Sequence, residues 1–460
     1  MITPSSASSP DEVASNTPRE GSGVTRRSFV KAASVIVPAV AGAVYAPSLA
    51  RAGYFARGED KLRIGVIGCG GRGTGAVEQA LMADPGCVLV AMGDVFKDRV
   101  DASLSALNEQ FAENAVDRIQ VPPERQFVGL DAYQKVIDSG VDVVLLTSYP
   151  CFRPQHLQAA IAAGKHVFAE KPLAVDGPGI RSVLASAEEA KKKNLAILVG
   201  FCWRYNAGMR RAFEQVDAGT LGPIVSAHTT YLTGALGKRP REPHWKDLEF
   251  QMRNWWHFTW ISGDHIVEQA VHSIDRLAWA TGDVMPTKVT CLGGRAARSG
   301  PEHGNVFDHF AATYEYENGL RTYHTCRQQD GLPSDNTDYV HGTHGYGSIN
   351  GWTGAFPMKS YDGAKLWDGK GDPNDAGKMY FDEHKELFAS IRAGKPINDC
   401  VRGANSCLMA IMARMAAYTG QTISWEQALS SKESLVPANL DLNMTLDIPP
   451  VAVPGKTKFV

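Results

Sequence analysis

Residues 61–73 read KLRIGVIGCGGRG, and this stretch decides the fold of the chain around it. The apolar run Leu62–Ile67 contains β-branched residues and predicts a buried strand. It leads into glycines at 68, 70 and 73 and then into a helical pattern over residues 74–82. In such a G-x-G-x-x-G turn the first glycine permits the tight turn, and the second lets a pyrophosphate approach the backbone. The third lets the helix pack closely on the strand.

A glycine-rich turn can also join a strand to a helix for structural reasons alone, so the following residues matter. A second apolar strand over residues 87–93 ends at Asp94, 21 residues after Gly73. A carboxylate at this distance is typical of the acid that binds the adenosine ribose hydroxyls. Asp94 favours NAD because a carboxylate repels a 2′-phosphate, while Lys97 and Arg99 keep NADP as an alternative. The predicted dinucleotide-binding residues here are Gly68, Gly70, Gly71, Arg72, Gly73 and Asp94.

The first fifty residues have the layout of an export signal. Residues 25–31, TRRSFVK, precede an apolar stretch at 32–46 and an A-x-A site at 50–52. The arginine pair predicts a twin-arginine signal, cleaved after Ala52. The alternative is an uncleaved membrane anchor, but the apolar stretch is shorter than the about 20 residues that span a bilayer. We therefore expect a periplasmic or extracellular protein without stable membrane insertion.

The predicted export route has a consequence for the cofactor. Twin-arginine transport moves folded proteins, and compartments outside the cytoplasm hold no pool of nicotinamide cofactor to exchange with. An exported dinucleotide enzyme must therefore bind its cofactor tightly and restore its redox state within its own reaction cycle.

Composition excludes some classes of partner. Without residues 1–52 the chain has 42 basic and 46 acidic residues, a net charge of −4, and no basic stripe for nucleic acid. About 400 residues can form two domains with their own cores. The eight cysteines are scattered without a C-x-x-C spacing and are interpreted as core residues, with one disulfide as an alternative.

The alternation of strands and helices continues after Asp94. Helical patterns cover residues 97–111, 131–139 and 154–163, and apolar strands cover 125–128, 141–147 and 166–169. The strand at 141–147 ends in a loop that begins with Thr147, at the edge where parallel sheets bind ligands. His156 lies in the following helix, and the strand at 166–169 runs into Glu170-Lys171-Pro172.

Together these motifs resemble the glucose–fructose oxidoreductase, inositol dehydrogenase and rhizopine-catabolism (Gfo/Idh/MocA) family over about residues 61–435. The resemblance implies that Lys171 is catalytic and reaches both the nicotinamide and the sugar hydroxyl, and that Pro172 forms a cis-type turn. It also implies cofactor contacts from Thr147, His156, Glu170 and Lys171. Without its neighbours, a lysine at a strand end would be interpreted as a solvated surface charge.

The resemblance also implies the architecture. We expect a signal at 1–52, a Rossmann NAD(P)-binding domain at 60–185, a substrate and oligomerisation domain at 186–435, and an extended tail at 436–460. The second domain would be α+β with a large open, mostly antiparallel sheet. A homo-oligomer, dimer or tetramer, is expected, and the substrate would be a carbohydrate.

Candidate substrate residues follow the first domain. Residues 201–206, FCWRYN, occupy the place where the family carries an Arg or aromatic residue at the sugar site, which implies Arg204 and Tyr205. The loop at 234–257 is rich in Arg, Trp and His and includes Trp255. Aromatic faces and bidentate donors suit carbohydrate binding, but such a loop equally suits a subunit contact.

The helical pattern at 263–275, which Asp264 can cap, contains the second half of the predicted chemistry. Glu268, His272 and Asp275 are spaced i, i+4, i+7 and are predicted to share one face. They resemble the family's D-x-x-x-H-x-x-D, in which the His transfers the proton, so His272 and Glu268 are implied to be catalytic and Asp275 to bind substrate. Glu268 replaces the usual Asp, which leaves open whether it orients His272 or contacts substrate. The alternatives are a core histidine between surface acids, or a metal on His265, Glu268 and His272, although no metal is expected.

The remaining chain is predicted to be scaffold. Strands are expected at 288–295, 307–315 and 320–327, with a hairpin at 317–319, and helices at 382–393 and 404–419 that pack on the first domain. Residues 328–378 are predicted to be rich in loops. Polar residues of this sheet would either form the sugar-site wall or be solvated; they are His309, His324, Arg327 and Gln328.

These features predict an exported NAD(P)-dependent sugar or polyol oxidoreductase with a retained cofactor. One alternative is an NAD-dependent, redox-neutral glycosidase of the same family, with Tyr205 or Glu268 as a second base. Another is a non-catalytic sugar or dinucleotide sensor, against which the presence of both Lys171 and His272 argues.

Overall fold

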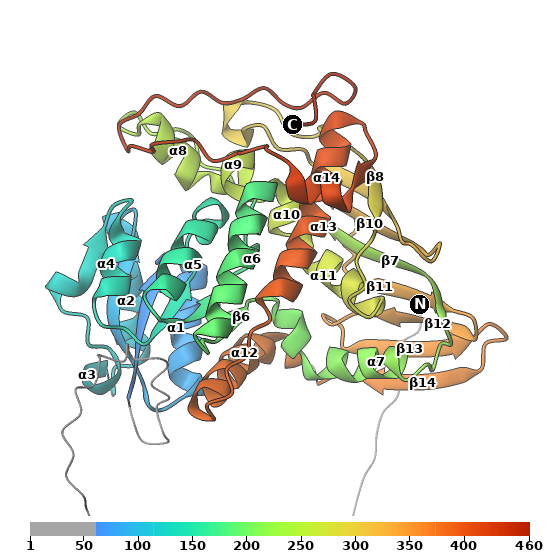
Figure 1. The fold of residues 1–460 in the computed structure, drawn as a ribbon, viewed down its shortest axis with the longest axis horizontal. Helices are drawn as coiled ribbons and strands as arrows, with labels where there is room; N and C mark the ends of the chain where they lie inside the picture. Colours follow the sequence, from blue (N-terminus) through green and yellow to red (C-terminus); the bar gives the residue numbers. More distant parts are fainter. Residues whose placement is uncertain (1–60, 114, 373) are drawn as a thin grey trace, which may run out of the picture. The chain divides into compact units, whose positions relative to one another are not determined.

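The computed structural model describes residues 61–113, 115–372 and 374–460. The predicted signal at 1–52 lies outside these residues. The first part of the described chain forms a six-stranded parallel sheet in the order β3-β2-β1-β4-β5-β6 (Figure 1). Its strands are β1 (Leu62–Ile67), β2 (Cys87–Asp94), β3 (Gln126–Val128), β4 (Val143–Leu146), β5 (His166–Ala169) and β6 (Ile197–Val199). This order, with helical crossovers, confirms the predicted Rossmann topology.

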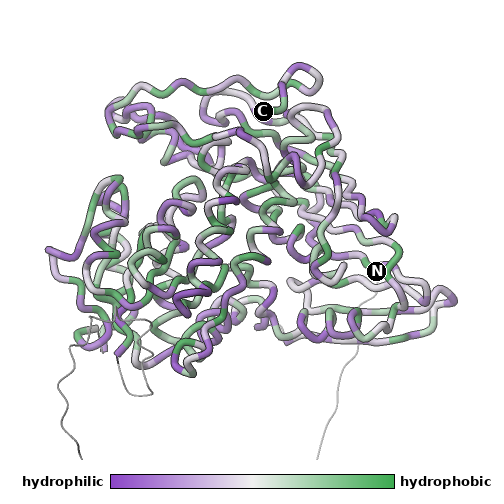
Figure 2. Tube along the Cα trace, viewed as in Figure 1, coloured by the Kyte–Doolittle hydropathy of each residue, from purple (hydrophilic) through white to green (hydrophobic). Residues whose placement is uncertain are grey.

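Helices flank this sheet because its central strands are apolar on both faces. Strands β1, β2, β4 and β5 are almost entirely buried. In Figure 2, colour alternates along the surrounding helices, as expected for helices with one buried face. These helices are α1 (Gly71–Ala83), α2 (Lys97–Gln110), α3 (Ala115–Arg118), α4 (Ala132–Asp138), α5 (Arg153–Ala162) and α6 (Gly177–Lys192), with the short 3₁₀ turns η1 (Pro123–Arg125) and η2 (Pro150–Phe152).

The boundary between the two domains differs from the expected one. Helix α6 runs through residue 185, and β6 pairs with β5 as the sixth strand of the first sheet. The sheet therefore extends to Val199. The apolar run at 195–200 forms the last strand of the parallel sheet, because β6 pairs with the free edge of β5.

The second sheet has nine strands in the order β14-β13-β12-β11-β7-β10-β9-β8-β15. All of its pairings are antiparallel except that of β7 with β10, which confirms the expected open, mostly antiparallel sheet. Three strands match predicted ones: β8 (Lys288–Gly294), β9 (His309–Glu315) and β10 (Arg321–Gln328). The sheet also contains β7 (Ile224–Thr233), and the short strand β15 (Ile423–Ser424) closes one edge.

Residues 328–378, which were predicted to be rich in loops, also form four strands that were not predicted. This segment contains β11 (Asp338–Gly342), β12 (Gly345–Ile349), β13 (Ala355–Ser360) and β14 (Lys365–Lys370). Each strand is only five or six residues long and is bounded by glycine-rich turns. These strands are difficult to recognise in the sequence, because turn residues interrupt them and their stability comes from sheet pairing rather than from an apolar run.

Helices cover one face of the second sheet and join it to the first domain. Helices α11 (Val271–Ala280), α13 (Cys400–Thr419) and α7 (Ala207–Asp217) contact this sheet, as Figure 1 shows. Helix α12 (Asp375–Arg392) packs on α1, and α13 also packs on α6, which confirms the expected docking of the late helices on the first domain. Tyrosines are exposed on the other face at Tyr323, Tyr339 and Tyr346. The expected homo-oligomer stays a prediction.

The last segment has neither helix nor strand, but it lies against the protein. After α14 (Trp425–Ser430), alternate tail residues pack on an apolar cluster that contains Leu248, Phe250 and Phe258. Gln251 donates to the Leu446 carbonyl at 2.8 Å, and the Leu446 N–H donates to Asp247 at 3.1 Å. The tail therefore holds the segment that contains α8 (Asp247–Arg253) and η4 (Trp255–His257). Its packed residues are Leu435, Val436, Leu440, Leu442, Met444 and Leu446.

All eight cysteines lie within the described part of the chain, and each is buried and unpaired, which confirms their interpretation as core residues. In that same part, no helix combines the length and apolarity that crossing a bilayer requires.

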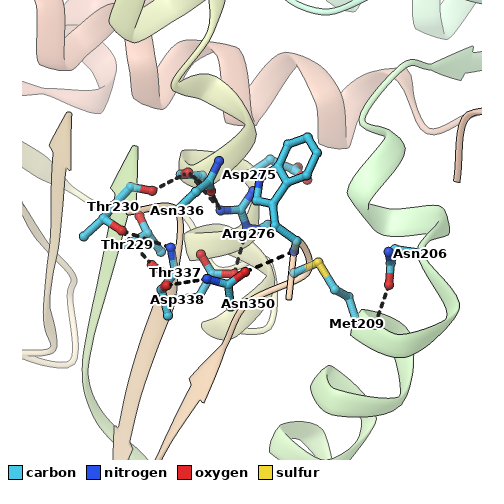
Figure 3. A network of polar contacts seen from close by, with 12 residues as sticks. Asn206, Met209, Thr229, Thr230, Asp275, Arg276, Asn336, Thr337, Asp338 and Asn350 are labelled. Carbon is cyan, nitrogen blue, oxygen red and sulfur yellow. Dashed lines mark hydrogen bonds and ion pairs between the residues drawn. The ribbon is translucent and has the colours of Figure 1, made fainter. Parts of the chain in front are cut away.

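A buried polar network fastens α11 to the second sheet (Figure 3). Arg276 Nε donates to Asp338 Oδ2 at 2.7 Å, and both side chains are 2% exposed or less. Arg276 also donates to Asn336 and to Ser273, whose hydroxyl donates to the Thr230 carbonyl at 2.9 Å. Helix α11 carries His272, so the network fixes the backbone that presents this residue.

We expect Asp338→Ala to lower the free energy of unfolding by about 3–5 kcal/mol, because it leaves the Arg276 charge buried without its partner. Urea unfolding of the purified protein measures this change. The control is Asp368→Ala, which breaks the exposed pair with Lys365 and should leave the free energy of unfolding nearly unchanged. Equal effects of the two substitutions would contradict the role given to the network.

Candidate active site

A cavity of about 790 Å³ lies where the carboxyl ends of the parallel strands meet the second domain. Every predicted cofactor-binding residue lines it: Gly68, Gly70, Gly71, Arg72, Gly73, Asp94, Thr147, His156, Glu170 and Lys171. Glu268, His272 and Trp255 line it from the second domain. The structure therefore brings the glycine turn, the Glu-Lys-Pro turn and the predicted proton-transfer residue to one cavity.

The glycine turn has the shape that a pyrophosphate requires. Gly68 has φ +98°, and a Cβ there would lie 2.5 Å from the Ser148 nitrogen. A Cβ on Gly73 would lie 1.9 Å from the Gly68 carbonyl oxygen. By contrast, a Cβ on Gly70 or Gly71 would meet nothing within 4 Å. Open space thus faces the backbone at the start of α1, where free N–H groups favour an anion, and these residues fit a dinucleotide.

Asp94 lies at the end of β2 and is held by the backbone. It accepts from the Cys69 N–H at 2.6 Å and the Phe96 N–H at 3.0 Å. Burial raises its pKa, while these two donors and the nearby Arg99 oppose that shift. Arg99 lines the cavity, whereas Lys97 pairs with Asp101 on the surface of α2. Of the two cations that kept NADP as an alternative, only Arg99 lies at the cavity.

Thr147 and His156 shape the cavity wall from β4 and α5. The Thr147 hydroxyl donates to the Gly68 carbonyl at 2.6 Å and so supports the glycine turn. The His156 ring stacks on Tyr133 at 4.1 Å, and its Nδ1 lies 3.0 Å from the Ser148 hydroxyl. Burial, reinforced by Arg153, lowers the pKa of His156 to about 3, so this imidazole is neutral at physiological pH.

Two arginines fix the Glu-Lys-Pro turn. Arg153, which is 2% exposed, donates to the Pro172 carbonyl and to the Ser148 carbonyl. Arg72 forms an ion pair with Glu170, with 2.7 Å between Nε and Oε1. The Lys171–Pro172 peptide is cis, as the family resemblance implied. Glu170 therefore acts through Arg72, which links the turn to the start of α1.

Lys171 reaches across to the second domain. Its Nζ donates to the Glu268 carbonyl at 2.6 Å and to Glu268 Oε1 at 3.1 Å. An ammonium has three N–H donors, so one remains for a ligand in the cavity. Glu268 thus orients Lys171, a role that was not among the two considered for it from the sequence.

His272 is held as a neutral imidazole. Burial lowers its pKa well below the ordinary value, and the charges of Lys171 and Arg276 lower it further. Its Nδ1 is buried without a hydrogen-bond partner among the described residues, while the side chain lines the cavity. A neutral imidazole beside an ammonium can accept a proton from a ligand hydroxyl.

The prediction that Glu268, His272 and Asp275 share one helical face is wrong. The helix is interrupted between α10 (His265–Glu268) and α11, so the i, i+7 relation does not hold. Asp275 is 1% exposed and does not line the cavity; it accepts from Arg204 at 2.9 Å and from Ser406 at 2.8 Å.

Arg204 and Tyr205 are also placed away from the cavity. Arg204 lies in η3 (Cys202–Tyr205) and pairs with Asp283 at 2.6 Å as well as with Asp275. Tyr205 is 5% exposed, and its hydroxyl donates to Asp399 at 3.3 Å. The segment turns these two side chains toward the interior, so they support the fold rather than the substrate site.

Other aromatic side chains line the cavity instead. Trp256 and Trp255 come from η4, and Trp255 packs edge-on against Tyr149 at 5.7 Å. Trp203 lies one residue before Arg204, and Trp352 follows β12. Trp352 and Tyr380 were not predicted, because both lie in segments without a recognisable motif. The role of the loop at 234–257 was open from the sequence, and the structure places Arg239 and Arg253 of this loop at the cavity.

The proposed metal set does not come together. His265 is buried against Phe310, and neither ring nitrogen has a partner among the described residues. Across residues 61–113, 115–372 and 374–460, no three His, Cys, Asp or Glu side chains are arranged to hold a metal ion.

Comparison with known families agrees with this geometry. A family model described as "Oxidoreductase family, NAD-binding Rossmann fold" matches residues 62–201, and the model "GFO/IDH/MocA C-terminal domain" matches residues 209–347. The chain belongs to the Gfo/Idh/MocA family. An inositol 2-dehydrogenase of Ralstonia nicotianae is 30% identical over 224 residues, which are 48% of this chain and 55% of that relative. The chain thus matches about half the length of this curated relative.

Solved structures share the fold at low identity. An aldose-aldose oxidoreductase from Caulobacter crescentus, complexed with glycerol, is 20% identical with a TM-score of 0.62. A levoglucosan dehydrogenase in complex with NADH and levoglucosan is 18% identical with a TM-score of 0.62. Each match covers 79% of this chain and 99% of the other.

We expect Lys171→Met to lower kcat/KM roughly 100- to 1,000-fold, as loss of one electrostatic stabiliser does. Because the Lys171 charge lowers the pKa of His272, its removal should raise that pKa. The rate falls when His272 is protonated, so the acid limb of the pH profile should move to higher pH. Lys192→Met, on the exposed surface of α6, is the control. An unchanged acid limb would show that His272 is not the titrating base.

Proposed function

We propose that this protein is an exported NAD(P)-dependent oxidoreductase that acts on a sugar or polyol hydroxyl and retains its cofactor. The observation that carries the proposal is the meeting of Lys171 and His272 in the cavity that also contains the glycine turn and Asp94. A sugar or polyol substrate is supported by the tryptophans of the same cavity, whose faces suit the apolar side of a sugar ring. The names of the relatives, an inositol 2-dehydrogenase and an aldose-aldose oxidoreductase, point to the same substrate class.

The chain's own groups would divide the work as follows. The free N–H of Lys171 donates to the oxygen of the substrate hydroxyl and favours the developing alkoxide. His272, neutral because of burial and its cationic neighbours, accepts the hydroxyl proton. When bound, the nicotinamide supplies the hydride acceptor. Glu268 holds Lys171 toward the substrate and balances its charge, and Arg72, Arg153 and Glu170 keep the turn in place.

NAD is the proposed cofactor because Asp94 lies at the predicted ribose position. A carboxylate there disfavours a 2′-phosphate, although Arg99 at the same cavity reduces this preference. Export by the twin-arginine route rests on the sequence motif at residues 25–52. If the protein works outside the cytoplasm, the cofactor cannot exchange and the second half-reaction must return the hydride to a second sugar or to the oxidised intermediate.

The experiment uses mature protein isolated from the periplasmic fraction, without added cofactor. We expect a bound dinucleotide, and a stoichiometric rise in reduced-nicotinamide absorbance on mixing with D-glucose or myo-inositol that a second sugar reverses. Aryl glycosides serve as a second substrate series. Release of aglycone without lasting reduction would indicate the redox-neutral glycosidase, and binding without turnover would indicate the sensor. Turnover only on added NAD would contradict cofactor retention.

The position of the tail suggests a structural cause for the proposed retention, which can be tested separately. The α8–η4 segment places Arg253, Trp255 and Trp256 on the cavity wall, and the tail packs on the other side of this segment. We expect Met444→Asp to speed dinucleotide release roughly tenfold, because it places a charge against the apolar cluster on which the tail packs. Release is followed by fluorescence after dilution.

The matched control is Thr445→Asp, which adds the same charge at the neighbouring exposed position of the tail. Release that is equally fast in both variants, or unchanged in Met444→Asp, would show that the tail does not retain the cofactor.

A further inference from the structure

The cavity wall between Glu268 and His272 contains the side-chain amide of Gln269, whose orientation is fixed by a hydrogen bond to Gln328. Gln269 lines the cavity, and its Oε1 accepts from Gln328 Nε2 at 2.6 Å. Gln328 is 1% exposed and lies at the end of β10. Its own Oε1 accepts from the guanidinium of Arg298, which is 7% exposed. These three side chains form a continuous hydrogen-bonded relay that ends at the cavity.

The chemistry of the relay determines which way each amide points. A guanidinium can only donate hydrogen bonds, so Gln328 must turn its oxygen toward Arg298. Gln328 then has only its NH₂ group for Gln269, and Gln269 must accept with its oxygen. The Gln269 NH₂ group is left for the cavity, and it has no hydrogen-bond partner within the described part of the chain. Arg298 thereby removes the usual ambiguity of amide orientation.

Arg298 is itself firmly held. Its guanidinium also donates to the Phe307 carbonyl, and its backbone N–H donates to Asp308 Oδ2 at 3.2 Å. The same Asp308 oxygen accepts from the N–H groups of Ala296 at 2.8 Å and Ala297 at 2.6 Å. The donor that sets the relay therefore cannot turn away without breaking several buried contacts.

We infer that Gln269 is a specificity residue that donates a hydrogen bond to a second oxygen of the sugar or polyol, next to the hydroxyl held by Lys171 and His272. This inference rests on the proposed function. Gln269 and His272 are three residues apart and line the same cavity, so their side chains can reach two groups of one ring. The partner oxygen must accept, and the site should therefore prefer substrates that keep an acceptor at this position.

The test compares D-glucose with its monodeoxy and monodeoxyfluoro analogues, with KM and kcat from turnover and affinity from calorimetry on dinucleotide-loaded protein. A fluorine can weakly accept a hydrogen bond but cannot donate one. At the position that Gln269 contacts, we expect wild-type affinity to fall in the order hydroxyl, fluoro, deoxy. Because the bond already exists in the ground state, the effect should appear mainly in KM.

Gln328→Glu reverses the direction of the hydrogen bond between the side chains of residues 328 and 269, and Gln269 itself is not substituted. A carboxylate still accepts from Arg298 but cannot donate, so Gln269 should turn its NH₂ group inward and present its carbonyl to the cavity. The fluoro analogue should then bind no better than the deoxy analogue, while the parent hydroxyl keeps part of its affinity by donating. Gln269→Leu should make all three ligands nearly equal, with a loss for the parent of about tenfold.

Two further variants distinguish an effect on the hydrogen-bonded relay from an effect on folding. Arg298→Met removes the obligate donor and should reduce the preference for fluoro over deoxy, and Gln120→Glu adds a charge at an exposed site of the first domain. Thermal unfolding verifies that each variant is folded. An unchanged ligand order in Gln328→Glu would overturn the inference while leaving the proposed function intact. If wild-type protein neither binds nor turns over any sugar or polyol, the proposed function fails, and the inference fails with it.

Discussion

The contact between Lys171 and Glu268 is the constraint on which the active site depends. Lys171 follows the fifth strand of the first sheet, and Glu268 lies 97 residues later in the second domain. Both side chains are nearly buried, 13% and 11% exposed, so loss of either partner would leave a charge poorly solvated. The contact therefore does two things at once. It joins the two domains at the cavity, and it leaves one ammonium proton free to meet a substrate oxygen.

The molecule uses several other charges to hold elements together rather than to bind ligands. Arg204 pairs with Asp275 and Asp283, and Arg276 pairs with Asp338. None of these five residues lines the cavity, whereas His272 and Glu268 do. Acids of one sequence motif are thus divided between scaffold and site: Glu268, before the interruption between α10 and α11, pairs with Lys171, and Asp275, after it, pairs with Arg204.

The second domain supplies the parts of the site that suit a sugar. Its sheet and loops bring tryptophans to a cavity whose other wall is the dinucleotide-binding turn. The end of β10 adds the Gln328–Gln269 contact, so the same cavity wall contains the imidazole of His272 and an amide of fixed orientation. The tail packs on the segment that contains α8 and η4, which lines another part of the cavity, so residues far away in the sequence support the cavity wall.

The sequence by itself determined the Rossmann sheet, the glycine turn, Asp94 and the Glu-Lys-Pro turn, because these depend on local patterns of apolar runs and glycines. It also identified His272 and Glu268 through a family resemblance. It could not place Arg204, Tyr205 and Asp275, because their partners Asp283, Asp399 and Ser406 are distant in the chain. The strands β11–β14 were hidden because short, glycine-bounded strands gain stability from pairing rather than from their own composition. Only the tertiary structure decided which polar residues face the cavity. The direction of a side chain is determined by its burial and by hydrogen bonds to residues distant in the chain, and not by its spacing along the sequence.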